Sequence, residues 1–319
     1  MDAVPQQVSS SGSAIAASRA SLSLLHPLFL SDIAASLFAA PDAARAPASL
    51  NRVAVRTRFF DLVASHAAQE GAEQFVFLGA GCCGRARRLP SLRGASVFEL
   101  DLPEVLAGKR AKLASLPAAA AVAYVPCDLR GAVLRDLLRP AGFDPALRTC
   151  VLAEGLFYYL EPAVVSSLLE QLSSLCPELL LCFSAVSAAA SPPSSGLPSF
   201  FRWRDDDPAS FAVSAGFPLA RNFALGEPAG GCDCFSDYLP SPLPPPKRAS
   251  PGRTFYTVAP CYMLPLALEV LGRSSGGRVV PSGNFWAVGQ AEEERYEARG
   301  RGGRVGERPV TTSPAFFAI

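Results

Sequence analysis

The sequence predicts an α/β protein built on a mostly parallel, doubly wound sheet. Short apolar runs alternate with helical segments, a glycine-rich turn follows the first run, and an acidic residue ends the second. Parallel neighbours in a sheet need long crossover connections, usually helices, so this alternation favours a parallel arrangement. The expected strands are residues 74–78, 96–100, 121–126, 149–153 and 179–184.

Helical patterns fill the intervals between these strands. Apolar residues recur every three or four positions in residues 13–40 and 53–71, and Gly71 is placed to end the second of these helices. Further helices are expected at residues 85–92, 102–115, 132–139 and 162–175.

The glycine-rich turn predicts a nucleoside-binding loop. Gly79, Gly81 and Gly84 follow the first strand, and Glu99 and Asp101 end the second. Glycines let the backbone approach a ligand closely, and an acid at the next strand end can accept both ribose hydroxyls. The same layout serves dinucleotides and S-adenosylmethionine, and a turn without a ligand is a third interpretation.

Acidic residues also end the third and fourth expected strands. Asp128-Leu129-Arg130 follows residues 121–126, and Glu154 follows residues 149–153. In an open parallel sheet, ligands bind beyond the carboxyl ends of the strands, so all these groups should meet at one edge. A nicotinamide dinucleotide uses the first two strand ends alone, whereas S-adenosylmethionine also needs polar groups for its adenine and methionine ends.

The composition gives no reason to expect a nucleic-acid, membrane or metal partner. The 319 residues include 29 basic and 28 acidic ones, and no apolar run reaches the length of a membrane span. Nine cysteines and two histidines show no zinc-type spacing, and they favour a reduced, intracellular protein. We expect a cytoplasmic location, with organellar targeting left open by the serine- and alanine-rich first thirty residues.

Several collinear stretches of the sequence resemble the leucine carboxyl methyltransferase family and its bacterial and fungal O-methyltransferase relatives. The stretches are residues 18–20 with 27–29 and Asp32, 55–61, 78–81 with 85–90, 97–103, 125–130, 141–145, and 152–156 with Tyr159-Leu160. The resemblance implies a class I methyltransferase (Rossmann-like) fold that binds S-adenosyl-L-methionine and methylates an oxygen, a carboxylate in particular. It also implies that residues 14–40 belong to an N-terminal helical cap.

The resemblance implies roles for individual residues at the cofactor. Arg56 matches the residue that binds the methionine carboxylate, and Gly79 and Gly81 match the cofactor loop. Asp101, with Glu99 beside it, matches the ribose acid. Asp128 and Leu129 match the pair of residues that contacts the adenine, and Glu154 matches the acid near the reactive centre. Arg19 stands where the family has a basic residue in its lid.

Two further side chains are hypothesised to hold the methyl acceptor. Arg130 follows the adenine pair, and its planar guanidinium suits a bidentate grip on a carboxylate. Tyr159, after Glu154, could add a hydroxyl from a neighbouring strand end. The acceptor itself, a small molecule or a protein C-terminal carboxylate, is not indicated, and neither is the oligomeric state.

The chain departs from the family pattern at the loop and beyond residue 184. Cys82-Cys83-Gly84 stand where the family usually has an aspartate and a hydroxyl residue, and the resemblance fades after Ser184. Two alternatives therefore stay open: an NAD(P)-dependent oxidoreductase that uses the glycine loop, and a non-catalytic relative that binds the cofactor.

The expected organisation has five parts. They are a disordered N-terminus at residues 1–12, the helical cap at 13–72, a cofactor-binding Rossmann-like core at 73–187, a C-terminal substrate-wall region at 188–291 that completes the sheet, and a disordered tail at 292–319. Within the C-terminal region we expect a helix in residues 199–217, an irregular proline-rich loop at 239–252, a helix or strand at 254–271 and a late strand at 284–289.

Overall fold

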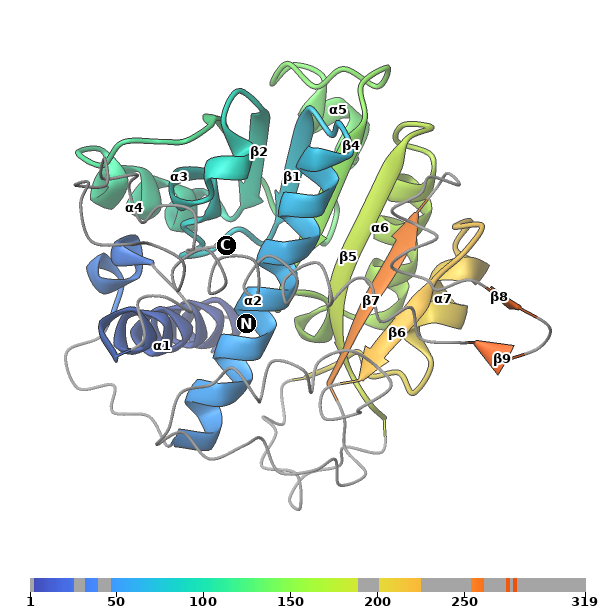
Figure 1. Cartoon of the computed structure of the whole chain (residues 1–319), viewed down its shortest axis with the longest axis horizontal. Helices are drawn as coiled ribbons and strands as arrows, with labels where there is room; N and C mark the ends of the chain where they lie inside the picture. Colours follow the sequence, from blue (N-terminus) through green and yellow to red (C-terminus); the bar gives the residue numbers. More distant parts are fainter. Residues whose placement is uncertain are drawn as a thin grey trace, which may run out of the picture.

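A seven-stranded sheet forms the centre of the protein in the computed structural model (Figure 1). The structure describes residues 3–25, 32–39, 47–188, 201–224, 254–260, 274–275 and 278–279. The expected loop at 239–252, the late strand at 284–289 and the tail at 292–319 lie outside the described residues.

The sheet is parallel through its first five strands and antiparallel at one edge. Its strands, in spatial order, are β3 (Ala121–Pro126), β2 (Ser96–Asp101), β1 (Gln74–Leu78), β4 (Thr149–Ala153), β5 (Leu179–Val186), β7 (Thr254–Pro260) and β6 (Arg221–Ala224). β1 pairs in parallel with both β2 and β4, whereas β7 runs antiparallel to β5 and β6. The strand order reverses at β1 and β4, which is where an open α/β sheet forms its binding crevice. This topology confirms the predicted doubly wound, Rossmann-like fold.

The predicted strands of the parallel part agree closely with the structure. β1, β3 and β4 have the predicted bounds, and β2 and β5 are longer than predicted by one and two residues. At the antiparallel edge, residues 254–260 form a strand where the sequence left helix and strand open. β6 was not predicted; it completes the edge by pairing with β7.

The helices connect these strands and cover the sheet. They are α1 (Ala3–Leu25), η1 (Ile33–Leu37), α2 (Pro47–Gln69), α3 (Arg85–Arg88), η2 (Pro90–Leu92), α4 (Pro103–Leu113), α5 (Leu134–Leu138), η3 (Phe157–Tyr159), α6 (Pro162–Ser173) and α7 (Pro208–Ser214), with a small ribbon of β8 (Ser274–Ser275) and β9 (Arg278–Val279). Proline stands at the first helical position of α4 and α6, where its missing N–H costs no hydrogen bond.

Two helix starts differ from the prediction. α1 begins at Ala3, so residues 3–12 are helical where disorder was expected, and α2 begins at Pro47, before the predicted start at Val53. Serine and glycine have low helix propensity, so residues 9–13 form part of α1 against their local preference. α1 then packs against η1 and α2.

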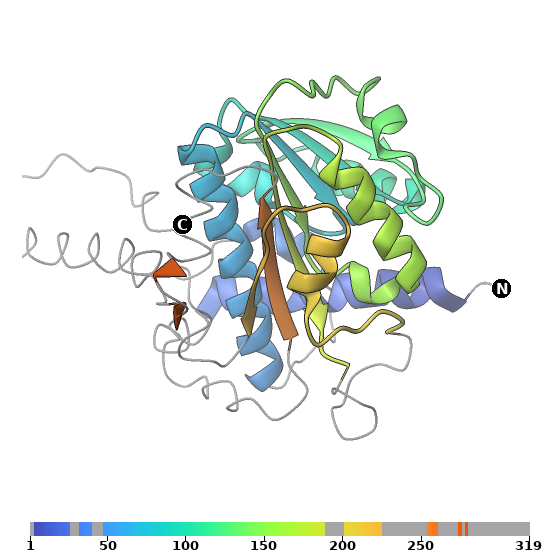
Figure 2. The same cartoon turned by 90° about the vertical axis from the view of Figure 1, so that its right-hand side faces the viewer.

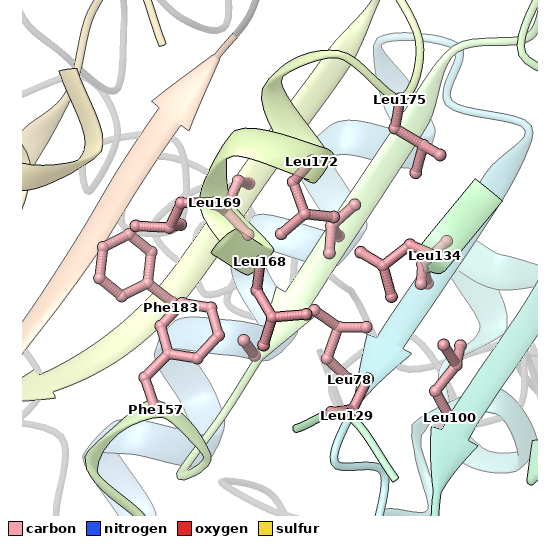
Figure 3. Packing of buried hydrophobic residues seen from close by; sticks show 14 of the residues in the cluster. Leu78, Leu100, Leu129, Leu134, Phe157, Leu168, Leu169, Leu172, Leu175 and Phe183 are labelled. Carbon is pink, nitrogen blue, oxygen red and sulfur yellow. The ribbon is translucent and has the colours of Figure 1, made fainter. Parts of the chain in front are cut away.

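Helices lie on both faces of the sheet, and each face has its own hydrophobic core. Figure 2 shows α2 and α6 on opposite sides of the strands. Phe75 and Phe77 of β1 pack in the cluster beneath α2, and the alternate residues Val76 and Leu78 pack in the cluster beneath α6. The second cluster contains leucines of α6 together with Leu78, Leu100 and Phe183 (Figure 3). Burial on both faces explains why these strands read as continuous apolar runs.

None of the helices in the described part of the chain combines the length and apolar character that crossing a membrane requires.

Candidate functional site

A cavity of about 550 Å³ opens at the carboxyl ends of β1 to β4. α1 and the glycine loop line it together with residues that directly follow β2, β3 and β4. The predicted polar strand ends therefore do meet at one edge of the sheet. Of the ten predicted site residues, nine line this cavity: Arg56, Gly79, Gly81, Asp101, Asp128, Leu129, Arg130, Glu154 and Tyr159.

The glycine loop has the tight backbone that its composition predicts. Gly79 has a φ of 63°, and a Cβ atom there would lie 2.9 Å from Cδ1 of Leu156. Gly84 has an ordinary φ, yet a Cβ there would lie 2.7 Å from Oδ1 of Asp32. A side chain at either position would force its neighbour to move.

Asp101 is held against the glycine loop by two backbone hydrogen bonds. Its Oδ2 accepts from the N–H of Gly81 and its Oδ1 from the N–H of Leu102, both at 2.7 Å. Burial raises the pKa of Asp101, while these two hydrogen bonds and the charge of Lys109 act in the opposite direction. The carboxylate thus has a fixed orientation at the cavity wall.

The structure does not bring Glu99 to the cavity, which corrects the expectation that it lies beside Asp101 as a second ribose acid. Glu99 is 2% exposed, and its Oε2 lies 2.8 Å from Nζ of Lys109 in α4. Although Glu99 and Asp101 are two positions apart on one strand and share a face, Glu99 is deeper in the sheet. The sequence alone did not show that Glu99 is buried while Asp101, at the end of the strand, reaches the cavity.

Asp128 and Arg130 form an exposed ion pair beyond β3. Nε of Arg130 lies 2.9 Å from both carboxylate oxygens of Asp128, and the N–H of Arg130 also donates to Oδ1. Hydrogen bonds from Arg130 lower the pKa of Asp128. Leu129, between them, is buried in the cluster beneath α6.

The strand order separates Arg130 from Tyr159. β2 and β1 lie between β3 and β4, so the ends of β3 and β4 are about 14 Å apart at the usual strand spacing. The two residues therefore follow strands that are not neighbours, contrary to the expectation that Tyr159 acts from a strand end next to that of Arg130. β3 and β4 are consecutive in the sequence, which suggested that they are neighbours. In the sheet, however, β3 lies at the edge and β4 lies on the other side of β1.

Glu154 lies between two guanidinium groups. Its Oε1 lies 2.8 Å from Nε of Arg56, and its Oε2 lies 2.6 Å from Nη1 of Arg85. Burial raises the pKa of Glu154, but the charges of Arg85 and Arg56 outweigh it, so that the pKa lies well below its usual value. The hydroxyl of Tyr158 accepts a hydrogen bond from Nη1 of Arg56 at 3.3 Å.

Arg85 is a site residue that sequence analysis did not identify. Its side chain is 2% exposed; it contacts Asp61 at 2.6 Å and donates to the backbone oxygen of Thr57 at 3.1 Å. A signal was present, because a carboxylate that ends an apolar strand, such as Glu154, needs a cation nearby. The sequence does not show which arginine supplies it.

These contacts belong to a larger network of buried charges beside the cavity. Nη2 of Arg88 lies 2.7 Å from Asp61 and its Nε 3.6 Å from Asp32, and Asp32 also lies 3.4 Å from Nε of Arg19. The network joins α1, the start of η1, α2, α3 and the end of β4. Among the residues that the structure describes, it contains four arginines and three acids: Arg19, Arg56, Arg85 and Arg88 with Asp32, Asp61 and Glu154.

Three aromatic rings line the cavity near Glu154. The ring of Phe201 lies 4.3 Å from that of Tyr158 and 5.2 Å from that of Tyr159, measured between centroids. Phe201 comes from beyond β5, where the resemblance fades, and no pattern in the sequence indicated its place in the site. We call these three residues the aromatic wall.

The model of the leucine carboxyl methyltransferase family matches residues 14–173, which is half of the chain. A Mycolicibacterium smegmatis protein with the provisional name S-adenosyl-L-methionine-dependent methyltransferase is 44% identical over 132 residues, covering 39% of this chain and 41% of that protein. A Mycolicibacterium gilvum protein of the same provisional name is 43% identical over 145 residues, covering 44% of this chain and 46% of that protein. The chain thus spans less than half the length of these curated relatives.

Solved structures similar to this one include a protein of Thermobifida fusca provisionally described as a methyltransferase. It is 20% identical, with a TM-score of 0.43, and the match covers 67% of this chain and 81% of that one.

Proposed function

Because the chain belongs to the leucine carboxyl methyltransferase family, we propose that it transfers a methyl group from S-adenosylmethionine to a carboxylate oxygen. One observation carries the proposal: the cavity has a fixed acid, Asp101, at the glycine loop and two arginines, Arg56 and Arg85, that contact Glu154. S-adenosylmethionine presents ribose hydroxyls and a carboxylate, which match these two features. The relatives' names are consistent with this cofactor.

The residues present fit this ligand group by group. The carboxylate of Asp101 would accept the ribose hydroxyls, with its orientation already set by Gly81. Asp128 would accept from the adenine amine while Leu129 packs beneath the ring. Arg56, fixed by Glu154 and Tyr158, would bind the methionine carboxylate.

The two arginines at Glu154 support the last of these contacts, because a guanidinium group can bind a carboxylate through two parallel hydrogen bonds. Arg85 would contribute indirectly, because it fixes Glu154, which in turn holds Arg56.

When bound, the cofactor supplies a methyl group on a positively charged sulfur, which makes that carbon electrophilic. A carboxylate acceptor is already ionised at neutral pH, so the protein need not provide a general base. Its residues would then align the two reactants and exclude water. The aromatic wall, in which Tyr158 is almost completely buried, would contribute to both at the Glu154 end.

The geometry changes the role proposed for Arg130. Its guanidinium donates hydrogen bonds to both carboxylate oxygens of Asp128, on the side of the cavity where the adenine would bind. We therefore propose that Arg130 orients Asp128, and that Tyr159, in the aromatic wall, contributes to the acceptor side.

The acceptor chemistry can be tested with S-adenosylmethionine labelled in its methyl group. The purified protein is incubated with peptides that end in a free carboxylate, with matched C-terminal amides, and with small carboxylic acids. A carboxyl methyl ester releases labelled methanol in mild alkali, whereas a methyl ether does not. We expect alkali-labile label with free carboxylates alone; alkali-stable label would contradict carboxylate methylation.

The same experiment addresses a non-catalytic relative, which would bind the cofactor and label no acceptor. The nicotinamide-dependent alternative gains no support from the comparisons.

A further inference from the structure

Lys109 of α4 is a buried cation that the proposed reaction does not itself use. Its side chain is 1% exposed and that of its partner Glu99 is 2% exposed, with 2.8 Å between Nζ and Oε2. Nζ also donates to the backbone oxygen of Ala80 at 3.3 Å, and Lys109 lines the cavity. One ammonium group therefore contacts β2 and the glycine loop at the same time.

Three adjacent contacts hold the glycine loop, two of them with β2 and one with α4. The N–H of Ala80 donates to the backbone oxygen of Leu100 at 3.1 Å, the N–H of Gly81 donates to Asp101, and the oxygen of Ala80 accepts from Lys109. Lys109 is the only one of these partners that comes from outside β2. Lys109 thus holds the loop from α4, whereas the other two hydrogen bonds hold it from β2.

A buried lysine and glutamate contribute little to stability compared with apolar side chains of similar size. Removing two charges from water is costly, and replacing such a pair by apolar residues is often neutral or stabilising. The position of this pair suggests another purpose, since it lies directly behind the loop and the acid that would hold the ribose.

We propose that Lys109, held by Glu99, is a positioning residue that fixes the glycine loop and Asp101 for cofactor binding. This inference rests on the proposed function of the same cavity. It assigns Glu99 an indirect role: Glu99 would orient Lys109 and not touch the cofactor.

The electrostatics agree with this geometry. Burial raises the pKa of Asp101, and the nearby charge of Lys109 opposes that effect. The other titratable groups near Asp101 are Glu104 of α4, Glu99 of β2, Cys82 of the loop and Cys127 beyond β3. Glu104 and Glu99 are acids, so Lys109 is the group among these that favours the charged form of Asp101.

The test compares a single with a double substitution, using S-adenosylhomocysteine as the probe in titration calorimetry. Lys109→Met leaves Glu99 buried without its partner, so we expect a lower Tm and weaker binding. Glu99→Met/Lys109→Met removes both charges, so we expect the Tm to recover to near wild type. Binding by the double variant should nevertheless stay about ten- to a hundredfold weaker than wild type, because the loop has lost its partner.

Two further variants separate positioning from stability. Lys109→Arg keeps a cation and should bind more tightly than Lys109→Met. Glu178→Met removes half of the exposed pair that Glu178 forms with Arg148, and it should leave both Tm and binding unchanged. In Lys109→Met the acid limb of the binding-versus-pH curve should move to higher pH, because Asp101 would then take up a proton more readily.

The outcomes distinguish the two proposals. If the wild-type protein does not bind S-adenosylhomocysteine, the proposed function fails. If wild type binds and the double variant binds within about twofold of it, the positioning role of Lys109 is wrong while the function stands. Should the double variant not fold, equal binding by Lys109→Arg and Lys109→Met would overturn the inference.

Discussion

Nη1 of Arg85 lies 2.6 Å from Oε2 of Glu154, and the two side chains are 2% and 10% exposed. This contact joins the helix after the glycine loop to the end of β4, across the carboxyl end of β1. Because Glu154 also contacts Arg56 of α2, one carboxylate connects three elements at the wall of the cavity.

Glu154→Gln should destabilise the protein strongly. The substitution keeps the size of the side chain but leaves two arginines facing a neutral amide, and breaking a buried pair in this way costs about 3–5 kcal/mol. Denaturant unfolding at neutral pH measures the loss. Glu178→Gln, in an exposed pair, is the matched control and should change the free energy of unfolding by less than about 1 kcal/mol. Equal effects of the two substitutions would show that the Glu154 pairs contribute little.

The network around Asp61 and Glu154 should make stability fall in acid. Burial raises the pKa of each carboxyl, but the neighbouring arginines lower it by more than burial raises it. Both pKa values therefore lie below the usual 3.8 and 4.5. Their stabilising contribution is therefore complete above these usual values and is lost as the pH falls towards the folded-state pKa values.

Free energies of unfolding measured between pH 7 and pH 3 test this dependence. We expect a decrease below about pH 5, and a smaller decrease in Asp61→Asn, which has one such carboxyl fewer. A wild-type profile that is flat or rising across this range would contradict the assignment, as would an unchanged slope in Asp61→Asn.

Asp101→Ala should weaken cofactor binding. The variant loses charge-assisted hydrogen bonds to the ribose of about 1.5–3 kcal/mol, which corresponds to about ten- to a hundredfold in affinity for S-adenosylhomocysteine. Titration calorimetry measures the change, and Asp136→Ala, at an exposed position of α5, serves as the control. Unchanged affinity in a folded Asp101→Ala protein would remove Asp101 from the site.

Arg130→Lys distinguishes the two roles considered for this residue. Lysine cannot reproduce the grip of Nε on both oxygens of Asp128, so we expect the KM for S-adenosylmethionine to rise about two- to fivefold. The KM for the acceptor should not change. The reverse pattern, in which the acceptor KM alone rises, would restore Arg130 as the acceptor anchor.

Local sequence patterns were sufficient to predict the parallel half of the fold. Apolar runs bounded by turn residues predict β1 and β4 because these strands are buried against helices on both faces. The antiparallel edge was harder to predict. β6 has four residues, Arg221–Ala224, and is a strand because it pairs with β7, a partner distant in sequence.

The site was predictable where its residues follow strands directly. The glycine loop, Asp101, Asp128 and Glu154 all line the cavity as the strand ends indicate. Arg85 and Lys109 were not predicted, because their importance comes from ion pairs with Glu154 and Glu99 across the fold. A charged residue in a helix is usually exposed. Its position in the helix therefore does not indicate that it is buried.

The most direct test of the account is equilibrium binding of S-adenosylhomocysteine and of NAD to the wild-type protein by titration calorimetry. The account predicts saturable binding of S-adenosylhomocysteine that Asp101→Ala weakens, and no binding of NAD at the same concentrations. Binding of NAD without binding of S-adenosylhomocysteine would contradict the proposed methyltransferase function.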